Sequence, residues 1–145
     1  MNTELTIQQV AEVTGLSTHA LRYYEKIGLL APIQRAANGH RRYSAEDVAW
    51  LEFLVRLRAT GMPIQKVLAF ADLVRQRPHE VHERRVLLEE HRDRVKKHLE
   101  ELTYNLCIIE LKIEHYKQLE ATGESDRNCI FWKNYLEQLS GDKLH

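Results

Sequence analysis

The chain has little of the residue types that build crosslinked, extended or membrane-spanning proteins. Its 145 residues include 2 cysteines, 3 prolines and 6 glycines. Two cysteines are too few for a disulfide scaffold, and so few prolines and glycines leave little room for disordered linkers. No stretch approaches the roughly 18 consecutive apolar residues of a membrane span, and the start lacks the pattern of a signal peptide. We therefore expect a mostly helical, cytoplasmic protein with no membrane partner.

Net charge is also lacking, because 21 lysines and arginines balance 21 aspartates and glutamates. The balance is uneven along the chain. Residues 1–77 hold 10 basic against 7 acidic side chains, a net charge of +3, and the remaining residues hold 11 against 14, a net charge of −3. A solvated surface would explain this modest asymmetry, but its direction also agrees with a front end that binds nucleic acid.

Two short helices are expected over residues 7–27. Thr6 can cap the first, and Gly15 supplies the left-handed residue that ends it. Ser17 then caps the second helix. This layout predicts a helix-turn-helix, although an ordinary helical hairpin within a core would show the same pattern.

A hairpin is expected next, over residues 30–43. The pair Asn38-Gly39 is a strong turn signal between two extended segments, which predicts a two-stranded β-ribbon. The tip carries ionisable side chains and the base an aromatic anchor: His40, Arg41, Arg42 and Tyr43. A solvated surface hairpin is the alternative, but the cations favour a wing that lies along DNA phosphates.

A third and a fourth helix complete a domain predicted to span residues 1–77. Ser44 and Asp47 form a variant capping box before an apolar helix. Its core residues are expected to be Trp50, Leu51, Leu54 and Leu57. Gly61 stops this helix and Pro63 begins the next. The corner between them exposes Arg58, Thr60 and Lys66, and could act as a second, smaller wing.

After Pro78 the apolar residues follow a heptad pattern, which predicts a coiled-coil helix over residues 78–120. We call the following set the seam: Val95, Leu99, Leu102, Leu106, Ile109, Ile113 and Tyr116. Val81 and Leu88 extend one of its two rows backward. Within this sequence nothing of matching length can cover the seam, so a second copy of the protein is the simplest partner. A helix folded back onto the domain is the alternative, and residues 121–145 form a short tail.

The stretch "ALRYYEKIGLL", residues 20–30, places an arginine, two tyrosines and two further charged side chains on the second helix. At about 100° per residue, the apolar side of this helix carries Leu16, Ala20, Tyr24 and Ile27. The opposite side carries Thr18, Arg22, Glu25 and Lys26, and Tyr23 lies on the border. Arg22 is therefore expected to point outward, and Tyr24 is expected to pack inward first.

The order of these pieces resembles the mercury-resistance regulator (MerR) family of bacterial transcription regulators. The resemblance rests on "LTIQQVAEVTGLS", "LRYYEKIGLL", "NGHRRYS", "LRATGMPI" and the terminal helix, and covers residues 5 to about 119. It implies an all-α fold with a small β-wing: a winged helix-turn-helix followed by an antiparallel coiled-coil dimerisation helix. It also implies a regulator that distorts an overlong promoter spacer until RNA polymerase can engage both promoter elements.

Carried over by position, the resemblance implies DNA contacts from Arg22 and Tyr23 in "LRYYE" and from Arg41 and Arg42 in the first wing. Four more residues are expected to contact DNA: Thr18 and Lys26 on the outer face of the second helix, Tyr43 at the base of the wing and Arg58 at the second corner. The expected DNA-binding residues are then Thr18, Arg22, Tyr23, Lys26, Arg41, Arg42, Tyr43 and Arg58. The family often has threonine where this chain has Ala20.

The effector is not indicated by these residues. The middle of the chain looks most like the branch that senses aldehydes and other thiol-reactive compounds, but Arg56 occupies the position of that branch's third-helix cysteine. Two cysteines remain as possible sensors: Cys107, more simply a buried structural thiol, and Cys129, in a polar loop near Arg127. Their separation argues against a thiolate metal site, and the helix-surface histidines His79, His82, His91 and His98 are expected to be solvated.

These patterns favour a dimeric, nucleoid-associated transcription regulator that binds double-stranded promoter DNA and reaches polymerase indirectly through the promoter. An architectural DNA-bending protein with the same winged fold is the alternative. We find no paired carboxylates in a cleft-forming context, no nucleophile motif and no glycine-rich phosphate loop, so an enzyme is not expected. No cofactor or metal is expected either.

Overall fold

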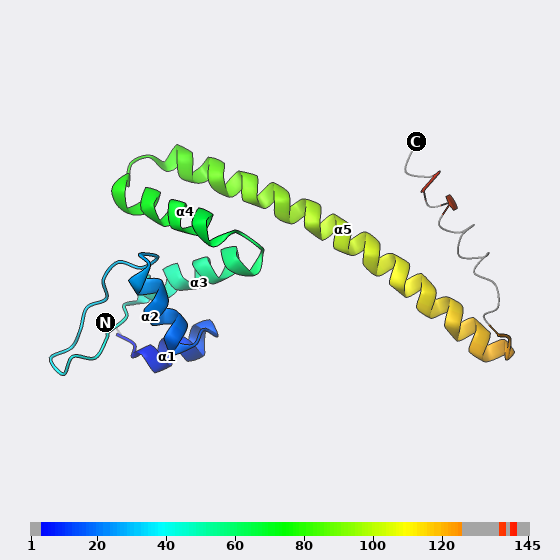
Figure 1. The fold of residues 1–145 in the computed structure, drawn as a ribbon, viewed down its shortest axis with the longest axis horizontal. Helices are drawn as coiled ribbons and strands as arrows, with labels where there is room; N and C mark the ends of the chain where they lie inside the picture. The colour runs from blue at the N-terminus through cyan, green and yellow to red at the C-terminus, as the bar shows by residue number, and fades with distance from the viewer. Residues whose placement is uncertain (1–3, 126–136, 139, 142–145) are drawn as a thin grey trace. The chain divides into compact units, whose positions relative to one another are not determined.

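The structure, a computed structural model, describes residues 4–125, 137–138 and 140–141. Among them are five helices, drawn in chain order in Figure 1: α1 (Ile7–Thr14), α2 (Thr18–Lys26), α3 (Ala45–Ala59), α4 (Ile64–Gln76) and α5 (Val81–Thr122). The chain divides into a first unit, Met1–Lys97, and a second unit, His98–His145. The helical fold class and the long C-terminal helix predicted from the sequence are confirmed.

The predicted caps form as expected in the first three helices. Thr6 and Gln9 make a capping box at the start of α1, and Gly15 ends that helix with φ of 74°. The Ser17 hydroxyl accepts from the backbone N–H of Ala20 at 3.0 Å. Side-chain oxygens thus satisfy N–H groups that a helix start leaves unpaired, and the two short helices expected within residues 7–27 are present as α1 and α2.

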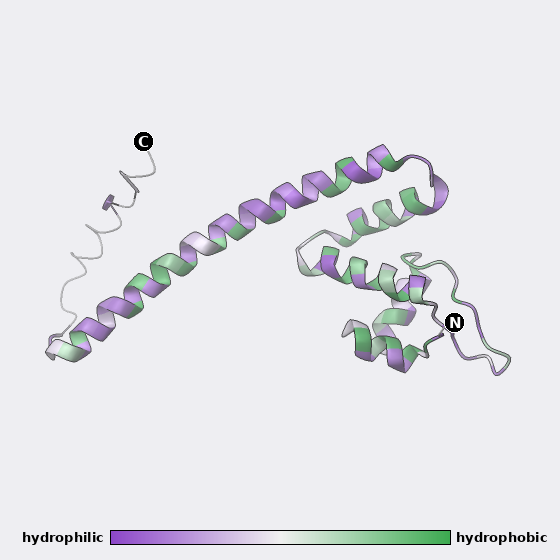
Figure 2. Cartoon of the chain, turned by 180° about the vertical axis from the view of Figure 1, so that it is seen from behind, coloured by the Kyte–Doolittle hydropathy of each residue, from purple (hydrophilic) through white to green (hydrophobic). Residues whose placement is uncertain are grey.

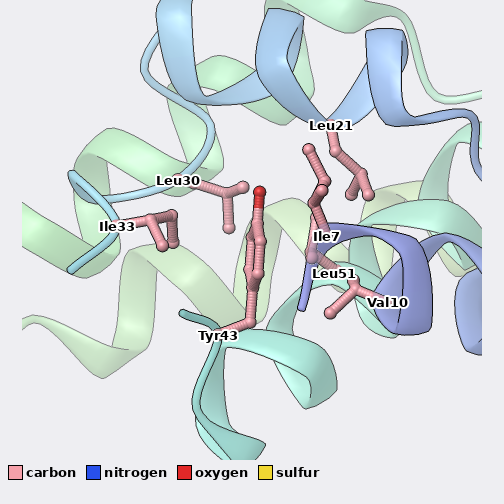
Figure 3. Packing of buried hydrophobic residues seen from close by; sticks show 7 residues of the cluster. All are labelled: Ile7, Val10, Leu21, Leu30, Ile33, Tyr43 and Leu51. Carbon is pink, nitrogen blue, oxygen red and sulfur yellow. The ribbon is translucent and has the colours of Figure 1, made fainter. Parts of the chain in front are cut away.

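Packing of the first three helices depends on a cluster that Figure 3 shows from close by. Its buried members come from α1, α2, α3 and the segments between them: Ile7, Val10, Leu21, Leu30, Ile33, Tyr43 and Leu51. Each fully buried aliphatic side chain here contributes roughly 1.5–3 kcal/mol relative to an exposed one. This cluster holds α2 by its inner face and leaves its outer face in solvent.

Tyr43 lies at the centre of this cluster, as its anchoring role predicts, but its assignment as a DNA contact is wrong. The side chain is 0% exposed. Its hydroxyl is buried and has no hydrogen-bond partner among the described residues. Burial raises the pKa of Tyr43 above its ordinary value, and the nearby Glu25 carboxylate adds to the rise. The hydroxyl therefore stays neutral within the core and does not reach a phosphate.

The wing over residues 30–43 is a hairpin, but not the continuous two-stranded ribbon that the turn signal predicts. Its arms are joined by backbone bonds from Arg42 to Gln34 and from Ala36 to His40, each 2.8 Å. Among the described residues, these bonds make one isolated bridge within the wing, between Arg35 and Arg41, and a second isolated bridge joins Leu5 to Tyr43. Tyr43 exchanges both of its backbone bonds with Leu5, so its hydrogen-bonding groups are not available to the opposite arm.

A second cluster joins α3, α4 and the start of α5 within the first unit. Leu54, Leu57, Val67 and Phe70 are buried in it, and Leu87 and Leu88 of α5 pack against it. Trp50 is only half-buried, in contrast to the core position expected for it. Its ring stacks on Phe70 with centroids 5.8 Å apart, and its indole N–H donates to the Leu29 carbonyl at 2.8 Å.

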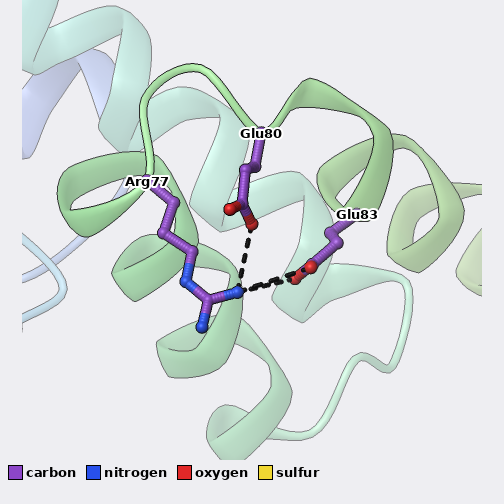
Figure 4. A network of polar contacts seen from close by, with 3 residues as sticks. All are labelled: Arg77, Glu80 and Glu83. Atoms are coloured by element: carbon purple, nitrogen blue, oxygen red, sulfur yellow. Dashed lines mark hydrogen bonds and ion pairs between the residues drawn. The ribbon is translucent and has the colours of Figure 1, made fainter.

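The connection from α4 to α5 carries a small polar network, shown in Figure 4. The Arg77 guanidinium contacts Glu80 at 3.0 Å and Glu83 at 3.4 Å. All three side chains are about half exposed, so screening by water leaves such pairs weak. Arg77 is therefore an arginine outside the wing that is already paired with carboxylates.

Helix α5 leaves most of the seam exposed in the single chain. Six of the seven seam residues are exposed, from Leu99 at 62% to Tyr116 at 46%. Figure 2 shows apolar residues recurring among polar ones along this helix. An exposed apolar stripe of this length marks an interaction surface. Cys107 on the same helix is also exposed, so its prediction as a buried thiol is wrong for the single chain.

His91 departs from the expectation that the α5 histidines are solvated. It is only 8% exposed, and its Nε2 lies 2.8 Å from the Thr60 hydroxyl. That hydroxyl donates to the Arg56 carbonyl at 2.7 Å, so the neutral imidazole donates its Nε2–H to Thr60. The contact ties the first part of α5 to the corner between α3 and α4.

Acid should destabilise the first unit through His91. Burial, with Arg94 and Lys66 nearby, holds the pKa of His91 below its ordinary value. Since the unfolded chain takes up this proton near pH 6.5 and the folded chain does not, stability is present above that pH and falls below it. We expect the free energy of unfolding to fall more steeply from pH 7 to pH 5 in the wild type than in His91→Gln. One proton accounts for a difference in slope of at most about 1.4 kcal/mol per pH unit, and the melting temperature should follow the same order. Parallel slopes in thermal melts would contradict this.

Candidate nucleic-acid interface

The outer face of α2 presents two cations and an aromatic ring to solvent. Arg22 and Lys26 are exposed, and Tyr23 is 50% exposed. Tyr24, in contrast, packs against both buried clusters, as the helical projection predicts. Because Leu21 is fully buried directly before Arg22, the helix is fixed in rotation and its polar residues face outward together.

Arg22 shares a hollow of about 420 Å³ with the wing and the start of α1. The lining residues are Thr6, Ile7, Gln8, Arg22, Arg35, Asn38, Gly39, His40, Arg41 and Arg42. Four of these are arginines and none is acidic. The fold thus gathers the outer face of α2 and the predicted wing around one cationic surface, which suits the phosphates of a nucleic acid.

The wing is joined to α2 by an ion pair that the sequence does not reveal. Arg41 Nε donates to Glu25 Oε2 at 2.9 Å, and the two side chains are only 21% and 19% exposed. The pair spans 16 positions of the chain. Arg41 therefore positions the wing against α2, and part of its guanidinium is already engaged.

Arg35 is a member of the cationic surface that sequence reasoning missed. It bridges Arg41 across the hairpin, and its Nη1 donates to the Gly39 carbonyl at 2.9 Å. The predicted hairpin contained the signal, because a residue opposite Arg41 on a two-armed turn lies on the same surface. Gln8, in the first turn of α1, gave no comparable signal.

Five of the predicted DNA-binding residues do not line this hollow: Thr18, Tyr23, Lys26, Tyr43 and Arg58. Thr18 is half-buried at the first position of α2. Arg58 is exposed, but its Nη1 donates to the Met62 carbonyl at 2.8 Å and so braces the corner after α3. Of the two possible sensor cysteines, Cys107 is exposed on α5 and Cys129 lies outside the described residues.

The described residues contain neither a cluster of metal ligands nor a membrane-spanning helix. In that part of the chain, no three histidine, cysteine or acidic side chains are gathered as metal ligands. None of the described helices carries an apolar stretch long enough to cross a membrane.

Comparison with known proteins identifies the family. Residues 5–72 match the model of the MerR HTH family regulatory protein, and residues 48–105 match the MerR DNA-binding model. An uncharacterized HTH-type transcriptional regulator of Haemophilus influenzae is 34% identical over 81% of this chain and 87% of its own. This chain belongs to the MerR family. It is therefore related to DNA-binding transcription regulators.

Further MerR regulators resemble the chain in sequence and in fold. The HTH-type transcriptional regulator AdhR of Bacillus subtilis is 35% identical, over 63% of this chain and 65% of its own length. The crystal structure of HiNmlR, described as a MerR family regulator lacking the sensor domain, bound to promoter DNA, aligns with a TM-score of 0.79. It is 33% identical and covers 84% of this chain and 92% of that one.

Loss of Arg41 should weaken DNA binding more than loss of Arg42. We expect Arg42→Ala to flatten the plot of log K against log salt by up to about one unit, with specific and non-specific DNA affected alike. Arg41→Ala should lose affinity further, because it leaves the Glu25 carboxylate unpaired beside the phosphates. Adding Glu25→Gln to Arg41→Ala should recover this additional loss, so that the affinity of the double variant is close to that of Arg42→Ala.

Arg77→Ala is the matched control for these titrations. It also removes an arginine that is paired with carboxylates, but it changes no residue of the cationic surface, so the salt dependence should stay as in the wild type. Equal losses in Arg41→Ala and Arg42→Ala would show that Glu25 does not matter for binding.

Proposed function

We propose that this MerR regulator binds promoter DNA as a homodimer and activates transcription by distorting an overlong promoter spacer in response to an effector. The observation that carries the proposal is the cationic hollow where Arg22 of α2 meets Arg35, Arg41 and Arg42 of the wing. A helix with outward polar residues beside a basic wing has the form of a major-groove reader flanked by a phosphate clamp.

Each side chain has a separate role in this proposal. Arg22 contacts base edges in the major groove, while Tyr23, Lys26 and Thr18 hold α2 on the adjacent backbone. Arg42 and the engaged Arg41 contact phosphates along the wing, and Arg58 approaches the backbone from the second corner. The exposure of Arg22, Tyr23 and Lys26 supports these roles.

The homodimer is supported by the exposed seam of α5. Burying the apolar residues from Leu99 to Tyr116 against an identical helix removes them from water, which is favourable by roughly 25 cal/mol per Å² of apolar surface. A symmetric pair also presents two reading helices at a fixed spacing, as a two-fold symmetric operator requires. The regulator needs no enzymatic activity of its own and acts on chromosomal DNA in the cytoplasm.

Transcription in vitro tests the distortion. Genomic fragments retained by the protein identify an operator, and two templates are then made from it: the natural promoter and one with its spacer shortened by two base pairs. The natural template should depend on the regulator, whereas the shortened one should be transcribed without it, because polymerase then reaches both elements unaided. Equal dependence of both templates would show that the protein acts by another route.

A further inference from the structure

The second corner, residues 58–66, joins α3 to α4 and carries basic side chains near the start of α5. Arg58 is exposed and Lys66 is half-buried. Lys66 of α4 and Arg94 of α5 both lie close enough to His91 to lower its pKa. The corner is therefore a basic surface of the kind that holds a DNA phosphate, and its orientation decides whether Arg58 reaches one.

Arg58 is attached to the backbone of this corner. Thr60 ends α3, and its backbone N–H donates to the Arg56 carbonyl at 3.1 Å. Gly61, with φ of 94°, then reverses the chain. Arg58 Nη1 donates to the Met62 carbonyl at 2.8 Å, which uses one of the five N–H donors of an arginine. The guanidinium therefore moves with the corner.

Apolar packing holds the corner near α5 without fixing its orientation. Met62 is 1% exposed, and it lies in the cluster against which Leu87 of α5 packs. The hydrophobic effect that stabilises such packing is not directional. It keeps the two elements together, but it leaves the corner some freedom to turn about the contact.

A polar contact supplies the missing direction. His91 of α5 is 8% exposed, and its Nε2 lies 2.8 Å from the Thr60 hydroxyl. That hydroxyl donates to the Arg56 carbonyl at 2.7 Å. Two hydrogen bonds in series thus connect α5 to the last turn of α3. Because hydrogen bonds weaken steeply when they are misaligned, this pair favours one orientation of the corner.

We propose that His91 is a positioning residue for DNA binding: through Thr60 it holds the second corner in the orientation in which Arg58 contacts a DNA phosphate. His91 itself is enclosed and does not touch the nucleic acid. An apolar side chain of similar size would keep α5 equally close, so the imidazole supplies orientation rather than attraction. This inference rests on the proposed function and adds to it a residue of α5.

A double-mutant cycle tests the coupling between His91 and Arg58. With wild-type His91, Arg58→Ala should weaken binding to an operator fragment retained by the protein several-fold. It should also flatten the plot of log K against log salt by up to about one unit. In a His91→Leu background the same substitution should weaken binding by less than half that factor, because the contact is already lost. Arg42→Ala, on the first wing, should cost the same factor in both backgrounds.

Conservative variants separate positioning from stability. His91→Gln has an amide N–H that can donate to Thr60, and Thr60→Ser keeps the hydroxyl, so both should preserve the full effect of Arg58→Ala. Thr60→Val removes the hydroxyl and should behave like His91→Leu, and it replaces that variant if His91→Leu does not fold. A residue that only stabilised the fold would lower affinity by the same factor with arginine or alanine at position 58.

The outcomes distinguish this inference from the proposed function. An undiminished effect of Arg58→Ala in the His91→Leu background would overturn the positioning role. A loss from Arg42→Ala with none from Arg58→Ala in the wild type would also overturn it, because the corner would then not contact DNA, while the proposed function would stand. No loss from either arginine would count against the DNA interface itself.

Discussion

Leu102→Asp should convert the dimer into a monomer of about 17 kDa and abolish operator binding at the same time. Leu102 lies in the middle of the seam and is 51% exposed in the single chain. In the proposed dimer the aspartate would place an unpaired charge among apolar side chains, which typically costs several kcal/mol. Two-fold symmetry doubles this free-energy cost, because each dimer interface contains two copies of the substituted residue. Sedimentation at micromolar concentration and an operator titration should show the two losses together.

Tyr104→Asp is the matched control for this change. Tyr104 belongs to the same helix, two residues away, and is 38% exposed, but it lies outside the seam. The same new charge there should leave both the mass and the operator affinity near the wild-type values. If Leu102→Asp remains dimeric, the seam is not the dimer interface. If it is monomeric but binds the operator normally, one copy is enough for recognition.

Arg22→Ala should cost the protein its ability to distinguish its operator from other DNA. A bidentate contact to a base edge is worth roughly 1–3 kcal/mol of discrimination, so specific binding should fall by about 5- to 150-fold. Non-specific binding should fall much less, because it depends on the number of phosphate contacts. Titrations of operator and scrambled duplexes at several salt concentrations measure both quantities.

The fold should survive this change, because Arg22 is exposed and the neighbouring Leu21 holds α2 in the core. Circular dichroism melts of Arg22→Ala and of the control Arg77→Ala should coincide with the wild type. An early melt would make Arg22 a structural residue. An equal loss on both duplexes would make it a phosphate contact, and the assignment of α2 as the reading helix would then be wrong.

Local signals made most of the helices predictable from the sequence. Thr6, Ser17 and Ser44 each cap the helix that was expected to follow, and the heptad pattern appears as one continuous helix from Val81 to Thr122. These features depend on neighbours within a few positions of the chain. They are set by backbone hydrogen bonding and by periodicity, both of which can be read without knowing the fold.

Features that depend on distant residues could not be predicted in this way. The Glu25–Arg41 pair joins two elements 16 positions apart, and it changes Arg41 from a free cation into an engaged one. His91 is polar and sits on a charged helix, yet the corner at Thr60 buries it. In each case the partner is far away in the sequence, so no local pattern marks it.

The ion pair between Glu25 and Arg41 also limits how this regulator could be re-engineered. A designer who transplants the reading helix of a relative to change operator preference would also replace one half of that pair. A helix without an acidic residue at position 25 would leave Arg41 unpaired, and the wing would lose its ion pair to α2. Chimeras should therefore exchange α2 and the wing together, as one cassette spanning residues 18–43.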